Sequence, residues 1–348
     1  MTHRGPVDPI AEMRRLIYGN WQTMTTCAFA ELGLADLLHG APQTAEELAS
    51  ATETDPRALL RFLRCCGQLS FVHMDTKTSR FSLTPFGDLL RSDHPGSQRA
   101  AARLNGAPYR YEPWGKLVDI LKSGSSKGRS PTFEEGSLAY LSDKPHLLNV
   151  FQRAMTDLSV LEDDAIAASY DFARFQHIVD VGCGRGTLIK AIMRAHPHLQ
   201  GTMFDLTESL AEVDGPDDEF ADRLSRAGGD FFESIPDCGD VYIMKNVVHN
   251  WPEAKVLTIL KTARDAMMRS SPGRHKRLLI IEYLMPEGNE KSVVKWIDMN
   301  FFILVDGGDR TADEYQKLVA RAGFDVLDFI ETPVGRHIIE LAPKGTPG

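Results

Sequence analysis

The sequence predicts an α/β chain in which a mostly parallel, Rossmann-like sheet with an antiparallel edge hairpin follows an α-helical domain. Three observations lead to this prediction. A buried strand runs directly into a glycine-rich turn over 177–186, sheet and helix patterns alternate from about residue 168 onward, and the first third is helical and rich in small residues. The length of 348 residues also exceeds the roughly 100 to 200 residues of a single domain.

We place the domain boundaries where the pattern changes. An N-terminal helical domain is expected over 1–105, linking helices over 106–167, and the sheet domain over 168–348.

Composition narrows the class of function. The net charge is −9, and the sequence has no polybasic tail, so we expect neither nucleic acid nor an anionic membrane as a partner. The five cysteines lack C-x-x-C spacing and a companion histidine cluster, which predicts reduced thiols and no metal. Without an apolar signal core or a run of roughly 18 apolar residues, we expect the cytoplasm as the location.

The N-terminal domain has the order of elements of a winged helix. Thr44 and Glu47 form a predicted capping box, and a second helix begins at Pro56. The segments 71–74 and 80–83 alternate as two short strands around a polar tip.

The second of these helices raises a rival interpretation. Arg57, Arg61 and Arg64 share one of its faces, where a DNA-binding protein would read the double helix. Because the chain is acidic and has no flanking basic arm, we expect this face to be solvated or to lie in an interface.

An apolar stripe precedes the winged helix. Its spacing of three to four residues predicts one long amphipathic helix that suits a core or a subunit interface. The stripe consists of Met13, Ile17, Trp21, Met24, Ala28 and Leu32.

The glycine turn indicates which ligand the sheet domain binds. Its glycines are Gly182, Gly184 and Gly186, and Thr187 stands where a dinucleotide fingerprint would have its third glycine. The resulting G-x-G-x-G pattern is typical of S-adenosylmethionine enzymes, whose ligand has no pyrophosphate. Asp205, at the end of the next strand, can accept hydrogen bonds from both ribose hydroxyls.

The remaining strands bring polar residues to the same edge of the sheet. We expect strands over 201–206, 240–245 and 277–284, and a closing hairpin from 324–329 and 337–341. Ligands of such sheets bind beyond the carboxyl ends of the strands. The residues expected to meet there are Gly182, Asp205, Asp230 and Lys245.

Two further features near this edge, the Asp230–Phe231 pair and His249, suggest roles. Asp230 and Phe231 suit an adenine site, although a helix cap and a core aromatic would look the same. His249 follows the strand ending at Lys245, and an imidazole with a reference pKa of about 6.5 is a natural proton acceptor.

Taken in order, these motifs resemble the S-adenosylmethionine-dependent O-methyltransferases of the plant caffeate and bacterial natural-product (aromatic polyketide) type. The resemblance covers nearly the whole chain. It rests on the glycine turn, Gly229-Asp230-Phe231-Phe232, Lys245 to Trp251, Leu278 to Glu282, and Gly307 to Thr311 with Glu314.

The resemblance implies a class I methyltransferase sheet, a homodimer formed through the N-terminal domain, and a small aromatic substrate. His249 would be the general base, and Asp298 or Asp309 would orient it. The implied cofactor residues are Gly182, Gly184, Gly186, Asp205, Leu206, Asp230, Phe231 and Lys245. Trp114, Phe151 and Met155 are large apolar residues near the domain junction that could close a pocket over a flat substrate, although core packing explains each of them equally well. Asn250 and Asn300 complete the expected pocket. Asn250 departs from the family, which commonly has aspartate there, and Asp309 stands where many members have glutamate.

Other chemistries remain open at this point. Relatives of this type also decarboxylate or hydroxylate polyketides, and a cofactor-sensing, DNA-binding regulator is the non-enzymatic alternative. The sequence favours a phenolic acid or an aromatic polyketide as the acceptor of the methyl group, without fixing which one.

Overall fold

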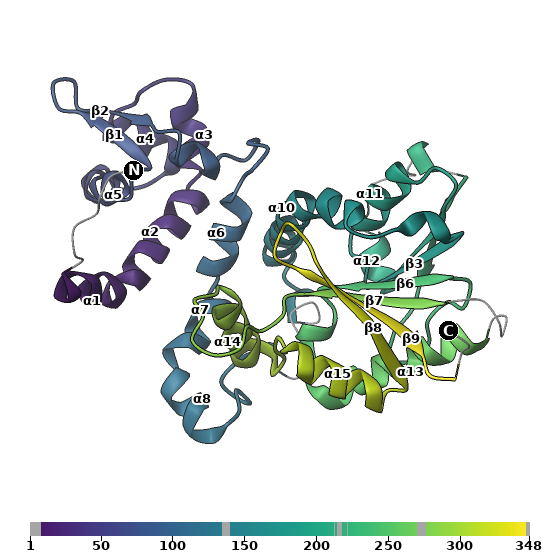
Figure 1. Cartoon of the computed structure of the whole chain (residues 1–348). Helices are drawn as coiled ribbons and strands as arrows, with labels where there is room; N and C mark the ends of the chain where they lie inside the picture. Colours follow the sequence, from purple (N-terminus) through teal and green to yellow (C-terminus); the bar gives the residue numbers. More distant parts are fainter. Residues whose placement is uncertain are drawn as a thin grey trace. The chain divides into compact units, whose positions relative to one another are not determined.

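We analysed a computed structural model, which describes residues 8–133, 140–211, 213, 218–220, 222–269 and 276–345. The chain forms two compact units (Figure 1). The first comprises Met1–Glu112 and Leu141–Leu158, and the second comprises Pro113–Tyr140 and Ser159–Gly348. The boundaries expected at 105/106 and 167/168 stay a prediction. No helix in the described ranges combines the length and the apolar character needed to cross a membrane.

The first unit is a helical domain with a two-stranded wing. Its elements are α1 (Pro9–Ile17), α2 (Gly19–Glu31), α3 (Leu34–His39), α4 (Ala45–Thr52), α5 (Pro56–Gln68), β1 (Val72–Asp75), β2 (Arg80–Leu83), the 3-10 helix η1 (Gly87–Leu90) and α6 (Arg99–Gly106). α7 (Pro108–Gly115) begins in this unit, as does α10 (Pro145–Ala168).

The local signals of the winged helix are confirmed. The Thr44 hydroxyl accepts from the Glu47 amide while the Glu47 carboxylate accepts from the Thr44 amide. Asp55 caps α5, and β1 pairs antiparallel with β2. These elements enclose a core that includes Phe29, Leu48 and Phe81.

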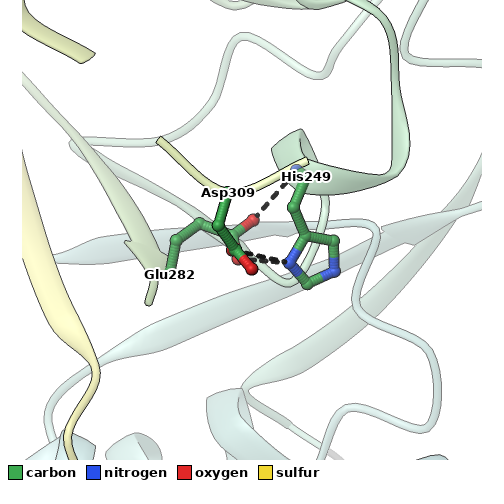
Figure 2. A group of neighbouring side chains, drawn as sticks. All are labelled: His249, Glu282 and Asp309. Atoms are coloured by element: carbon green, nitrogen blue, oxygen red, sulfur yellow. Dashed lines mark hydrogen bonds and ion pairs between the residues drawn. The ribbon is translucent and has the colours of Figure 1, made fainter. Parts of the chain in front are cut away.

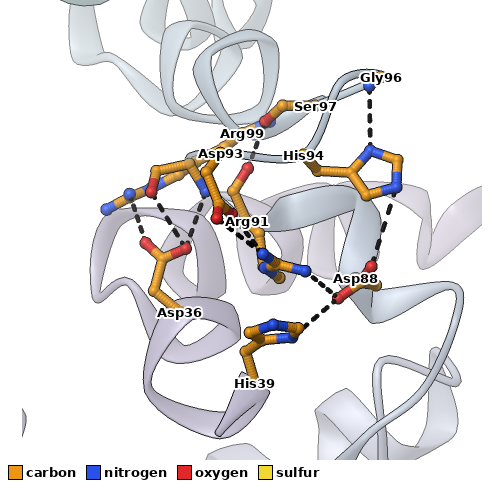
Figure 3. Close-up of polar contacts among 10 residues, drawn as sticks. Asp36, His39, Asp88, Arg91, Asp93, His94, Gly96, Ser97 and Arg99 are labelled. Atoms are coloured by element: carbon orange, nitrogen blue, oxygen red, sulfur yellow. Dashed lines mark hydrogen bonds and ion pairs between the residues drawn. The ribbon is translucent and has the colours of Figure 1, made fainter.

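Charged side chains join α3 to the segment after the wing (Figure 3). Arg91 pairs with Asp88 at 3.1 Å and with Asp93 at 2.7 Å, while Arg99 reaches Asp36 at 2.7 Å. The guanidinium of Arg99 also donates to the carbonyl of Ala30. These contacts attach the start of α6 to α2 and α3.

The prediction of one long opening helix is wrong. The apolar stripe is divided between α1 and α2, because Tyr18 leaves helical geometry (φ −90°, ψ 7°) and is both the last cap of α1 and the first cap of α2. Met13, Ile17 and Trp21 are 57–63% exposed, so this part of the stripe lies outside the core of the chain.

The arginine face is exposed, as its spacing predicts. Arg57, Arg61 and Arg64 all point to solvent from α5. Their assignment to a solvated or interface surface, in preference to DNA contact, stays a prediction.

The second unit contains a seven-stranded sheet. Its strands are β3 (His177–Val181), β4 (Gln200–Asp205), β5 (Leu224–Gly228), β6 (Val241–Lys245), β7 (Arg277–Glu282), β8 (Phe324–Glu331) and β9 (His337–Pro343). Their order is β5-β4-β3-β6-β7-β9-β8. The first five are parallel, and β9 and β8 close the sheet as an antiparallel hairpin.

This arrangement confirms the predicted fold class. The strand order changes direction between β3 and β6, and a crevice at such a switch point is where sheets of this kind bind ligands. β5 is absent from the predicted strands because it is a half-exposed edge strand and therefore lacks a continuous apolar run.

Helices cover both faces of the sheet (Figure 1). The helices and 3-10 segments of this unit are α8 (Leu117–Ser123), η2 (Phe172–Arg174), α11 (Thr187–Ala195), α12 (Thr207–Ala211), η3 (Asp218–Phe220), η4 (Val248–Asn250), α13 (Glu253–Arg269), α14 (Val294–Val305) and α15 (Ala312–Arg321). α13 and α15 pack on the face that carries Val179 and Val181, while α11 and the end of α10 pack on the face that carries Ile178. The alternation follows from the two-residue period of a strand.

We expect Ile280→Ala to lower the free energy of unfolding by about 2–5 kcal/mol, because Ile280 is fully buried in a central strand and its loss leaves a cavity. Leu327→Ala on β8 is the control, since Leu327 is 49% exposed, and should cost less than about 1 kcal/mol. Chemical denaturation measures both. Equal losses would contradict the burial described for β7.

Candidate functional site

The glycine turn after β3 has a backbone that favours glycine at each of its three positions. Gly182, Gly184 and Gly186 have φ values of 72°, 55° and 69°, which residues with a side chain rarely adopt. A Cβ at Gly186 would lie 2.6 Å from the Met203 side chain, whereas a Cβ at Gly184 would meet no atom within 4 Å. The turn therefore packs tightly on one side and is open at Gly184.

Asp205 is fixed beside this turn. One carboxylate oxygen accepts from the Gly184 amide at 2.8 Å, and the other accepts from the Leu206 amide at 2.8 Å. Leu206 itself is 41% exposed. The structure thus brings three of the expected cofactor residues together at the carboxyl ends of β3 and β4.

Asp230 and Phe231 follow β5 at the same edge of the sheet. The Asp230 carboxylate accepts from the Phe232 amide at 2.8 Å, which is the local cap that the alternative interpretation allowed. Phe231 packs edge to face against Phe232 and Trp251. These contacts pack the segment against Trp251, and its assignment to adenine stays a prediction.

Lys245, at the end of β6, has an unforeseen partner on α10. Its ammonium is buried, lies 2.5 Å from the Asp163 carboxylate and contacts the Ser159 hydroxyl at 3.3 Å. Glu162 is 3.6 Å away. A ligand that binds Lys245 would therefore have to share its ammonium with Asp163.

A second buried acid lies below the turn. Asp180 is 3% exposed, and burial, with Asp163 nearby, raises the pKa of its carboxyl to about 7, although Lys245 opposes the shift. Asp180 is not among the predicted site residues, since it stands within an apolar run.

His249 sits in the short turn η4, which is held from two sides. Asn246 adopts a left-handed conformation (φ 58°), and its carbonyl accepts from the Asn250 side-chain amide at 2.6 Å. One oxygen of Glu282, at the end of β7, accepts from the amides of Val248 and His249. The side-chain amide of Asn250 thus closes the turn locally, and its expected place in the substrate pocket stays a prediction.

Two carboxylates face the imidazole (Figure 2). Nδ1 of His249 lies 2.8 Å from Glu282 Oε2 and 3.7 Å from Asp309 Oδ1, and the other ring nitrogen points away from both acids. Burial lowers the pKa of His249, but Glu282 and Asp309 raise it, and the balance lifts the pKa to about 9. Phe301 stacks on the ring with centroids 4.1 Å apart.

The acid nearest to the imidazole is one that sequence reasoning missed. Glu282 was noted only as part of a motif, because its position at the end of an apolar strand gives no sign that it meets His249. Asp309 lies close to the ring as expected. Asp298 instead accepts a hydrogen bond from the Asp309 amide at 3.0 Å, so it supports the loop that carries Asp309.

That loop approaches the histidine turn closely. The Gly308 amide donates to the His249 carbonyl at 2.9 Å, and a Cβ at Gly307 would lie 2.1 Å from the same oxygen. The two glycines therefore allow Asp309 to reach the imidazole.

α14 completes the surroundings of His249 and is held by hydroxyl groups. The buried side chains of Ser130 and Thr132 both donate to the Leu304 carbonyl at 2.8 Å, and Ser126 donates to the Phe302 carbonyl. These carbonyls belong to the last turn of α14, where the helix itself supplies no donors. The contacts place Phe301 against the imidazole.

Two of the expected pocket residues contact each other within the second unit. Trp114, near the end of α7, donates from Nε1 to the side chain of Asn300 on α14 at 3.1 Å. Phe151 and Met155 belong to α10 in the first unit, where Phe151 is half-buried and Met155 is 36% exposed. Their role in the pocket stays a prediction.

Comparisons with known proteins agree with this arrangement. An O-methyltransferase domain family matches residues 114–325, and an O-methyltransferase dimerisation domain family matches residues 14–93. The chain is 33% identical over 342 residues to the phenazine O-methyltransferase PhzM of Lysobacter antibioticus, covering 97% of this chain and 98% of the relative. It is 32% identical over 328 residues to a 3-amino-4-hydroxybenzoate 4-O-methyltransferase of Streptomyces cremeus, covering 93% and 87%.

A solved structure adds the cofactor. The O-methyltransferase NcsB1 from neocarzinostatin biosynthesis, in complex with S-adenosylmethionine and 2-hydroxy-5-methyl naphthoic acid, matches with a TM-score of 0.79 and 28% identity, covering 92% of this chain and 95% of that one. Together with the glycine turn and the class I sheet, these matches establish that the chain belongs to the family of S-adenosylmethionine-dependent O-methyltransferases.

Proposed function

We propose that this enzyme transfers a methyl group from S-adenosylmethionine to a hydroxyl of a small aromatic natural product, with His249 as general base. The observation that carries the proposal is the pairing of a buried imidazole with Glu282, at the same edge of the sheet as the glycine turn and Asp205. A base oriented by a carboxylate is a recurrent catalytic arrangement.

The residues at the turn suit S-adenosylmethionine. Gly184 leaves open space where a side chain would stand, so the backbone can approach a ligand closely. The buried acids Asp163 and Asp180 near Lys245 suit a ligand that carries positive charge, since a nearby cation favours the ionised form of a carboxyl. We assign the ribose to Asp205, the adenine to Asp230 and Phe231, and further contacts to Gly182, Gly186, Leu206 and Lys245.

The cofactor supplies an electrophilic methyl group, and the acceptor oxygen supplies the electron pair. A phenol with a pKa of about 10 is a weak nucleophile until its proton is removed. We assign this removal to the ring nitrogen of His249 that points away from the acids, because Nδ1 faces Glu282. The imidazolium that forms is stabilised by the two carboxylates.

The same three side chains could also be considered as cation ligands, since their donor atoms lie within 4.8 Å of one another. The two acids raise the pKa of His249 to about 9 against the effect of burial, so a protonated imidazole already places a positive charge beside them. We therefore interpret this group as a proton-binding site, and we expect a chelator to leave turnover unchanged.

The acceptor class rests on the relatives and on the residues near His249. Phe301 stacks on the imidazole, and the preceding residue Asn300 binds the Trp114 indole, so α14 offers both flat and polar groups of the kind that bind an aromatic acid or a polyketide ring. The relatives reported above are named for aromatic substrates. We propose a phenolic acid or an aromatic polyketide, bound by a homodimer that forms through the dimerisation domain.

Product analysis tests the proposed reaction. Purified enzyme, S-adenosylmethionine and a panel of hydroxylated aromatic acids and polyketide rings should give one equivalent of S-adenosylhomocysteine for each methyl gained, with NMR assigning the methylated atom. Loss of carbon dioxide or gain of oxygen would favour the decarboxylating or hydroxylating alternative. Salt-sensitive binding to random duplex DNA without turnover would favour a regulator.

We expect His249→Ala to lower turnover by about a hundredfold to ten-thousandfold, which is the usual contribution of a general base. Calorimetry should show that affinity for S-adenosylmethionine is retained, because His249 lies apart from the glycine turn in the proposed scheme. His146→Ala is a suitable control, since that side chain is 70% exposed on α10. Unchanged turnover of a phenolic acceptor would remove His249 from the mechanism.

The rate should depend on pH through the same imidazole. With a pKa of about 9, His249 is mostly protonated at neutral pH, and its neutral form increases about tenfold per pH unit up to that pKa. We therefore expect kcat/KM for a phenolic acceptor to rise with pH and to level off near pH 9.

Glu282→Gln keeps an acceptor for the turn amides but removes the negative charge that raises the pKa of His249. The rising limb of the pH profile, in which kcat/KM increases with pH, should therefore move to lower pH. Glu340→Gln, at a buried carboxylate paired with Arg277, should leave the limb in place. A limb that Glu282→Gln does not move would show that this acid does not set the protonation of His249.

A further inference from the structure

The hairpin at the edge of the sheet carries an arginine to the carboxyl ends of the parallel strands. β9 runs antiparallel to β7 with His337 opposite Glu282, so the turn before β9 lies at the edge where β7 ends. Thr332 holds this turn by donating its amide and hydroxyl to the Arg336 carbonyl, both at 2.9 Å. Arg336 is therefore fixed immediately beyond the catalytic end of β7.

The guanidinium of Arg336 contacts three separate segments. It lies 2.6 Å from Glu162 on α10, donates to the Asn246 side-chain oxygen at 2.7 Å, and covers the Tyr283 ring at 4.1 Å. The side chain is buried, with 6% exposure for the residue. Tyr283 also donates from its hydroxyl to Glu162 at 3.2 Å, which closes the group.

Two of these segments determine the geometry of the base. Asn246 is the left-handed residue whose carbonyl receives the Asn250 amide, and it therefore begins the turn that presents His249. Tyr283 directly follows Glu282 in the chain. Arg336 thus connects the start of the histidine turn to the strand end that supplies its carboxylate.

Arg336 also adds a buried positive charge beside the acids. Burial opposes the charged guanidinium, but Glu162 and other acids, including Glu282, outweigh burial and raise the pKa of Arg336 above its ordinary value. Burial raises the pKa of the Asp309 carboxyl, whereas His249 and Arg336 lower it. The charged and titratable groups facing Arg336 are Glu162 on α10, Glu282 and Tyr283 at the end of β7, and Asp309 after α14, with Lys245 and Asp163 bordering Glu162.

We propose that Arg336 is a positioning residue for methyl transfer: it holds the Asn246–Asn250 turn against the Glu282 strand end and places a positive charge beside the carboxylates that face His249. This inference rests on the proposed role of His249. Arg336 itself is assigned no contact with substrate or cofactor.

Replacing the charge tests both parts of the proposal. We expect Arg336→Met to lower kcat by about tenfold to a hundredfold, because small displacements of a catalytic group have effects of this size. It should also move the rising limb of the pH profile to higher pH by about half a unit to one unit. Without the positive charge of Arg336, the imidazolium is less disfavoured and the pKa of His249 rises. Arg336→Lys keeps the charge but not the forked geometry, so the limb should return toward its original pH while kcat recovers only in part.

Arg277→Met is the matched control. Arg277 is a half-buried arginine of the same sheet that pairs with Glu340 at 2.9 Å, at the opposite end of β7. A general loss of stability should affect the melting temperatures of both methionine variants, but only Arg336→Met should move the pH limb. A second variant tests the proposal if Arg336→Met does not fold. Glu162→Gln removes the negative charge beside Arg336 but leaves the arginine in place, and it should move the rising limb of the pH profile to lower pH.

The outcomes separate this inference from the proposed function. If Arg336→Met has an unchanged kcat and pH limb while His249→Ala is inactive, the role of Arg336 is overturned and that of His249 remains. If Arg336→Met and Arg277→Met lose activity equally with the same pH profile, Arg336 contributes stability only. If His249→Ala is fully active, the proposed function fails first.

Discussion

The contact between Glu282 and the turn of His249 is the interaction on which the rest of the site depends. One carboxylate oxygen faces the imidazole at 2.8 Å, while the other accepts from the amides of Val248 and His249. A single side chain thereby fixes both the backbone of the turn and the environment of its ring. Because β6 and β7 are parallel neighbours, the turn after one strand and the last residue of the other meet at the same edge.

The cost of burying charge explains why the surroundings are so heavily cross-linked. Carboxylates and ammonium groups are stable away from water only where partners compensate for lost hydration. Lys245 is accordingly paired with Asp163, Arg336 with Glu162, and His249 with Glu282. These pairs connect α10, the strand ends and the closing hairpin, so elements distant in the sequence share one arrangement of charges.

Loops and helix ends around the site also hold the surroundings of His249 in place. Gly307 and Gly308 permit the backbone to reach the His249 carbonyl, and the hydroxyls of Ser130 and Thr132 satisfy the last turn of α14. Phe301 is consequently held against the imidazole. The surroundings of His249 are thus built from several segments that lie far apart in the sequence.

The sequence by itself determined the elements whose signals are local. The capping box at Thr44, the glycine turn from Gly182 and the apolar strand 178–181 each depend on neighbours a few residues apart, so they were predictable. Only the tertiary structure decided which acid meets His249, that Asp298 supports the Asp309 loop, and that Lys245 pairs with Asp163. It also divided the apolar stripe at Tyr18 into two helices. The three contacts join residues that are 11 to 82 positions apart. Their geometry is set by how strands and loops pack in the fold, which leaves no mark in the spacing of the residues themselves.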